Sequence, residues 1–178
     1  PASDGSSDGK LSTMSKRGLD LEKKGAALRA SAQAEGAVLA SVLQQLKTEQ
    51  RQGGERISKW QDQAATLSLS RLCLRAVSWK PGSPRGNRGE FGEEISLPIE
   101  HISWVRAQDK TTEHKRGRDI PSDCGFLDCI FVIKMSDGYD GGTHYILAAG
   151  SAEERRRWIF ALTSRRPLLA SIENPVPS

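Results

Sequence analysis

Apolar and polar residues alternate along the chain from residue 64 to residue 149. Ala65 and Leu67 alternate with polar residues, and so do Leu72 and Leu74 after a short turn. A period of two is typical of antiparallel strands with one buried face. Further strands are expected at residues 95–106, interrupted at Pro98, and at 127–134 and 144–148, with long polar loops at 80–92 and 108–125.

The segment between residues 36 and 47 fits two periods. Its apolar residues suit a helix as well as a strand, and short apolar runs cannot be assigned by period alone. We place the first strand at residues 42–48. Residues 49–59 are then expected to form a polar connection to the second strand.

The last regular element is predicted to be a helix from residue 151 to about residue 166. Ser151 can cap its first turn, Glu154 can reach back to the amide of Ser151, and Pro167 is expected to end it. Trp158 and Leu162 lie on one side at helical spacing and need a surface that covers them. The helix therefore closes a small β body, with Trp158 and Leu162 as its structural residues.

Residues 11–36 are predicted to form a basic helical arm after a disordered tail at residues 1–10. They combine good helix formers with five basic residues. Either the arm lies on an anionic membrane, or it packs on the domain, which would span residues 37–168 and precede a C-terminal tail at 169–178. Phe160 projects away from Trp158 on the closing helix, so we hypothesise that the arm covers it.

Composition indicates a globular domain without metal or cofactor. No run approaches the roughly 20 apolar residues that a membrane span needs. The three cysteines form no C-x-x-C pair, and the three histidines have no catalytic partner at a motif spacing. We therefore expect a cytoplasmic monomer that is not an enzyme. Because a fold can bring distant groups together, an enzyme stays open as a third alternative.

Basic residues concentrate in one part of the chain. The protein has a formal net charge of +4 and a sequence pI of about 9.1. Residues 36–88 carry nine basic and three acidic side chains, a charge of +6, whereas residues 89–178 carry eleven basic and fourteen acidic ones, a charge of −3. A basic rim attracts an anionic membrane by about 1 kcal/mol per nearby Lys or Arg. Nucleic acid ranks below lipid, because no aromatic residues are interleaved with the basic ones.

The candidate lipid-binding residues form two groups. The first flanks one short connection, which could bring the side chains together: Lys47, Arg51, Arg56 and Lys59. The second lies in the following polar loop: Lys80, Arg85 and Arg88. Basic runs are most often solvated faces without a ligand, and this explanation is stronger for Lys115, Arg116 and Arg118 in a different loop.

The order of elements resembles the pleckstrin homology (PH) family. Residues 94–102 look like the family's fourth-strand region, and residues 145–149 followed by Ser151, Trp158 and Leu162 are similar to its last strand and helix. The resemblance covers residues 42–166. It implies a mainly β fold, a seven-stranded antiparallel barrel or sandwich closed by a C-terminal helix, and a membrane adaptor that takes lipid headgroups at its open end. Another small barrel with a capping helix, such as a phosphotyrosine-binding-like module, would share most of these features.

The sequence departs from the family where many lipid-binding members have W-K-K-R-W-F-V-L. Gln61 and Gln63 replace the two cations that grip paired phosphates, with Asp62 between them. Glutamine cannot form the charge-assisted bonds that phosphates favour. We therefore expect phosphatidic acid, whose single compact phosphomonoester needs fewer cations. A phosphoinositide ligand, or a protein partner and no lipid, are the alternatives.

A lone PH domain behind a short basic helix also resembles the acylated PH-domain proteins of apicomplexan parasites. This resemblance rests on the whole arrangement and on no diagnostic motif. It implies a fatty-acylated amino terminus upstream, a peripheral position on the cytosolic face of a secretory organelle, and phosphatidic acid sensing in regulated secretion. One acyl chain gives only marginal attachment, so binding would depend on a second, electrostatic signal.

Overall fold

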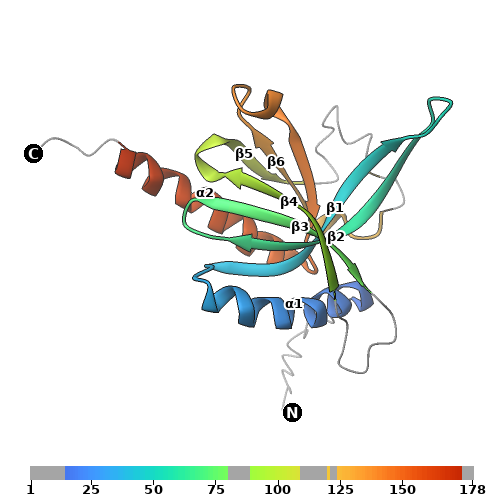
Figure 1. The fold of residues 1–178 in the computed structure, drawn as a ribbon, viewed down its shortest axis with the longest axis horizontal. Coiled ribbons are helices and arrows are strands. Elements are labelled where there is room, and N and C mark those ends of the chain that lie inside the picture. Colours follow the sequence, from blue (N-terminus) through green and yellow to red (C-terminus); the bar gives the residue numbers. More distant parts are fainter. Residues whose placement is uncertain (1–14, 80–88, 109–119, 121–123, 174–178) are drawn as a thin grey trace, which may run out of the picture.

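A seven-stranded antiparallel sheet and two long helices make up the described part of the chain (Figure 1). The computed structural model describes residues 15–79, 89–108, 120 and 124–173. The elements are α1 (Lys16–Ala34), β1 (Leu39–Gln50), β2 (Arg56–Leu67), β3 (Arg71–Trp79), β4 (Gly89–Pro98), β5 (Ile102–Ala107), β6 (Ile130–Met135), β7 (His144–Ala148) and α2 (Ala152–Glu173). Short 3-10 turns lie at Ile99–His101, Leu127–Cys129 and Asp140–Gly142.

The strand order joins two antiparallel meanders at β1. The order is β4-β3-β2-β1-β7-β6-β5, so the first strand pairs with β2 on one side and with the last strand on the other. Leu74 and Leu97 from one meander share a core with Ile133 and Leu147 from the other. The predicted PH-like fold is therefore confirmed: both meanders enclose one core, and a C-terminal helix closes it.

Helix α2 closes this core as predicted. The side chains of Trp158 and Leu162 are fully buried in it. The Trp158 ring Nε1–H donates a hydrogen bond of 2.9 Å to Oγ of Ser41 on β1. The one polar atom of the indole is thus satisfied, so its whole apolar surface contributes to packing.

Both ends of α2 differ from the prediction. Ser151 does cap the helix, since its Oγ accepts the Glu154 N–H at 3.1 Å, but the Glu154 carboxylate accepts from Gly150 N–H at 2.9 Å rather than from Ser151. The helix also does not end before Pro167 but continues to Glu173. A proline removes one backbone hydrogen bond and has a helical φ, so a helix can continue past it.

Three strand boundaries were also predicted wrongly. The first strand is twelve residues long, from Leu39 to Gln50, and the polar residues 49–59 belong largely to the paired strands rather than to a connection. β4 begins at Gly89, inside the stretch predicted as loop, because Gly89 and Glu90 pair with the end of β3. Residues Leu127–Cys129 form a 3-10 turn before β6. Polar side chains and glycines concealed the outer end of the hairpin and the start of β4, because strands that leave the core have no apolar alternation.

Helix α1 packs on the sheet, which is one of the two predicted arrangements of the arm. Its residues Leu21 and Gly25 are buried, and a Cβ on Gly25 would lie 3.4 Å from the backbone nitrogen of Val42 in β1. Gly36, with φ of +83°, then turns the chain into β1. Phe160 stays 75% exposed, so the hypothesis that the arm covers it is wrong. Helix α1 therefore lies close against β1 and does not cover Phe160 on α2.

Candidate functional site

The β1–β2 hairpin projects from the body of the molecule, at the upper right of Figure 1. Its strands pair without interruption from Leu39 with Leu67 to Gln50 with Arg56. Residues 51–55 connect them, and Gly53 and Gly54 adopt φ of +105° and +84°, which few other residues tolerate. Residues 47–59 thus form a defined, exposed extension of the sheet.

One face of the hairpin continues the inner face of the barrel. Leu43 is part of the core and lies opposite Gln63; the next pairs outward on the same face are Gln45 with Gln61 and Lys47 with Lys59. Two lysines therefore stand directly opposite each other where β1 and β2 leave the buried core, the place that we call the barrel mouth. Like charges in this position destabilise a sheet unless an anion lies between them.

The next residue on this face, Glu49, pairs with one of the two lysines. Its Oε1 lies 2.9 Å from Nζ of Lys59. The hydrogen bond and charge of Lys59, and then the charges of Arg51 and Lys47, hold the pKa of Glu49 below its ordinary value. Of the predicted cations, Lys59 is thus ion-paired with Glu49, and the charges of Arg51 and Lys47 also act on the same carboxylate.

The other predicted cations are placed differently. Arg56 pairs with Gln50 on the outer face of the hairpin, beside the hydroxyl pair of Thr48 and Ser58 at 3.0 Å. The second group lies outside the described residues: Lys80, Arg85 and Arg88. So do Lys115, Arg116 and Arg118.

Buried amides lie beneath the lysine pair. Gln63 is 1% exposed and Gln45 is 7% exposed. The Nε2 of Gln63 and the Oε1 of Gln45 have no hydrogen-bond partner in the part of the chain that the structure describes. The floor of the barrel mouth is therefore polar but uncharged, in contrast to the paired cations of many lipid-binding PH domains.

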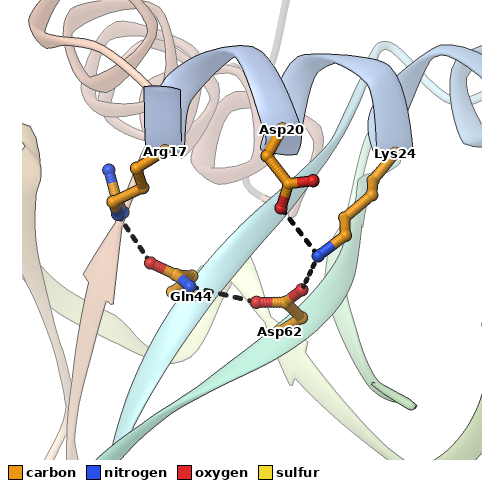
Figure 2. Close-up of polar contacts among 5 residues, drawn as sticks. All are labelled: Arg17, Asp20, Lys24, Gln44 and Asp62. Carbon is orange, nitrogen blue, oxygen red and sulfur yellow. Dashed lines mark hydrogen bonds and ion pairs between the residues drawn. The ribbon is translucent and has the colours of Figure 1, made fainter. Parts of the chain in front are cut away.

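Asp62 faces the opposite side of β2, towards α1 (Figure 2). Nζ of Lys24 lies 2.9 Å from Oδ2 of Asp62 and 2.8 Å from Oδ2 of Asp20. Gln44 donates to Oδ1 of Asp62 at 3.1 Å and accepts from Nε of Arg17 at 2.7 Å. The positive charge of Lys24 balances the negative charge of Asp62. The Asp62 carboxylate points away from Lys47 and Lys59, which lie on the other face of the hairpin.

Arg17 connects α1 to two further parts of the fold. It donates to the carbonyl oxygen of Ala149 at 2.8 Å, and its guanidinium lies 3.9 Å from the ring centre of Phe126. Burial lowers the pKa of Arg17, although nearby thiols and Asp62 oppose this effect. Sequence reasoning missed this docking network. The available signal was the spacing of Arg17 and Lys24, seven residues apart on one helix face.

Other chemistry is sparse in the described residues. They contain no group of three or more His, Cys, Asp or Glu side chains that could hold a metal ion. None of their helices is both long enough and apolar enough to span a membrane. The three cysteines are free thiols, and burial raises the pKa of Cys129 to about 11.

No family model matches the sequence, and no curated protein matches it. The fold is similar to the Slm1 PH domain in complex with phosphoserine, with 14% identity, a TM-score of 0.43, and coverage of 73% of this chain and 96% of that one. It is also similar to the N-terminal PH domain of human ARAP2, with 14% identity, a TM-score of 0.40, and coverage of 80% and 87%. For PLC21 of L. pealei the values are 13%, 0.45, 74% and 16%.

The PH-like fold of this chain rests on its own strand order, its shared core and its closing helix. The side chains of the hairpin decide what it can bind.

Proposed function

We propose that this chain is a non-catalytic PH-like module that binds anionic phospholipid headgroups at a membrane surface, with phosphatidic acid favoured. The observation that carries the proposal is the pairing of Lys47 with Lys59 on the inner face of an exposed hairpin. Cross-strand lysines repel each other, and a phosphate between them would turn this repulsion into two attractive contacts. Arg51 at the start of the turn adds a third cation.

The uncharged floor supports a headgroup with one phosphate. A second phosphate deeper in the mouth would meet Gln45, Gln61 and Gln63 instead of cations. Amides can donate a hydrogen bond to it but cannot offset its charge, so desolvating it there is unfavourable. The cation cluster at the rim suits the single phosphomonoester of phosphatidic acid better than a polyphosphoinositide.

Attachment of the module to the membrane would be peripheral and would depend on more than the hairpin alone. Each basic residue near an anionic surface contributes about 1 kcal/mol, so Lys47, Arg51 and Lys59 together give only moderate binding. A second signal, such as an acyl chain, would strengthen it. A cytosolic position on a secretory organelle and a role in regulated secretion remain expectations from the resemblance to the acylated PH-domain proteins.

Vesicle co-sedimentation tests this proposal. Vesicles of phosphatidic acid, phosphatidylserine and a bisphosphorylated phosphoinositide are compared at matched surface charge. Lys47→Gln with Lys59→Gln should abolish pelleting, whereas Arg156→Gln with Arg157→Gln removes the same charge from the exposed surface of α2 and should leave pelleting nearly intact.

Three outcomes have distinct meanings. Preferential pelleting with phosphatidic acid supports a headgroup site, and equal pelleting with all anionic vesicles reduces it to surface electrostatics. If the protein pellets with none of the vesicles, the lipid proposal is contradicted and a protein partner is favoured.

A further inference from the structure

Glu49 is bonded to Lys59, one of the cations that a ligand phosphate would contact. It lies between Lys47 and Arg51 in the sequence, on the same face as Lys47. Its carboxylate pairs with Lys59 at 2.9 Å, and the two side chains are 60% and 57% exposed. A ligand phosphate that approaches Lys59 therefore meets a carboxylate already bonded to that lysine.

This arrangement is specific to Glu49. Glu55, the other acidic residue of the hairpin, lies in the turn, where its backbone carbonyl oxygen accepts the N–H of Arg51 at 2.9 Å. The described ion pairs of the hairpin include no contact of the Glu55 carboxylate with Lys47 or Lys59. The two glutamates thus carry the same charge on the same hairpin but differ in their relation to the cation cluster.

We propose that Glu49 is an internal competitor that a phosphomonoester must displace from Lys59, so that it sets the affinity threshold of the site. This inference rests on the proposed function. An exposed ion pair is weak, so displacing it is possible. A phosphomonoester carries a charge of about −1.5 to −2 near neutral pH. The attraction between this charge and Lys47, Arg51 and Lys59 is therefore stronger than that of the Glu49 carboxylate, which carries a single charge. A phosphodiester has a charge of only −1, the same as Glu49, so replacing Glu49 beside Lys59 would strengthen the attraction little.

The competition gives a prediction that simple electrostatics does not give. Removing the Glu49 charge should strengthen phosphate binding mainly when Lys59 is present, because Lys59 is the group that becomes free. We expect Glu49→Gln to raise the affinity for phosphatidic acid vesicles by about two- to fivefold in the wild-type background. In a Lys59→Gln background the same change should have a clearly smaller effect.

The experiment is a double-mutant cycle on the full chain, with Glu55→Gln as the matched control. Binding to phosphatidic acid vesicles is measured for the wild type, Glu49→Gln, Lys59→Gln and the double variant, and Glu55→Gln is placed in the same two backgrounds. Glu55→Gln changes the net charge equally, so it should give a smaller increase that does not depend on Lys59. An effect of Glu49→Gln that is equal in both backgrounds, or equal to that of Glu55→Gln, would overturn the inference.

Soluble glycerol 3-phosphate distinguishes the source of the phosphate. If it shows the same dependence on Glu49 and Lys59, the site recognises the phosphomonoester itself; if only vesicles do, it recognises the group on a lipid. Wild-type binding without coupling between Glu49 and Lys59 would reject this inference alone. Absence of binding by the wild type and every variant, in vesicles and in solution, would reject the proposed function and this inference with it.

Discussion

The two helices cover different parts of the sheet and are held by different forces: α1 packs on β1, whereas α2 packs mainly on β5, β6 and the 3-10 turns that precede them. α2 inserts Trp158 and Leu162 completely into the core and bonds to Ser41 of β1. α1 lies over the other face of β1, where its buried residues are Gly18, Leu21, Gly25 and Ala32. One large apolar side chain and a polar network, rather than a core, hold this helix.

Two clefts border α1. One of about 390 Å³ lies beside Leu28 of α1 and Phe91 of β4, and one of about 300 Å³ lies between Gly18 of α1 and Glu154 at the start of α2. Elements with few buried apolar contacts open at lower free energy than the core does. We therefore expect α2 to unfold together with the core, whereas α1 is an outer layer whose contacts with Gln44 and Asp62 depend on the charges of Arg17 and Lys24.

The largest loss of stability should follow from removing the Trp158 side chain, by which α2 is anchored in the core. Trp158→Ala removes a fully buried indole and leaves Ser41 Oγ without its donor. We expect a loss of about 3–5 kcal/mol in the free energy of unfolding, measured by urea denaturation, because the cavity cannot be filled. Trp158→Phe keeps most of the volume and should cost clearly less. A loss below about 1 kcal/mol for the alanine variant would contradict the role of α2 as part of the core.

These different forces also explain which parts of the fold the sequence could predict. The alternation from Ala65 to Leu74 and the helical spacing of Trp158 and Leu162 report burial in one core, so the sheet and the closing helix were predictable. The outer half of the hairpin was not, because residues 49–59 pair through backbone bonds and bury little. The candidate cations could be chosen from charge, but only the register shows that Lys47 faces Lys59 while Arg56 faces away.

A smaller effect should follow from breaking the α1 network. The side chains of Lys24 and Asp62 are each 13% exposed, so the pair is only partly screened. Lys24→Met should lower the stability by about 2 kcal/mol, between the values for exposed and fully buried pairs. Hydrogen exchange should show faster opening of α1 with little change in the sheet.

A double-mutant cycle sharpens this prediction. Lys24→Met combined with Asp62→Asn removes both charges, so it should cost less than the sum of the two single changes. Arg29→Met is the matched control, because Arg29 pairs with Glu22 at an exposed position of the same helix. Additive effects in the cycle, or an equal loss from Arg29→Met, would show that the polar network does not hold α1.

The smallest effect is expected at Phe160, which belongs to neither helix interface. It lies two residues from Trp158 on α2 but is 75% exposed. Phe160→Ser should change the free energy of unfolding by less than about 0.5 kcal/mol, since exposed substitutions away from special features rarely do more. Thermal unfolding and hydrogen exchange of α1 measure this together. If the substitution lowered the melting temperature and exposed α1, the Phe160 side chain would be in contact with α1 in solution, and the conclusion that α1 leaves Phe160 uncovered would be wrong. If the melting temperature and the hydrogen exchange of α1 both stay unchanged, the Phe160 side chain is available to a partner. Loss of vesicle or protein binding in this variant, with unchanged stability, would then show that Phe160 contacts such a partner.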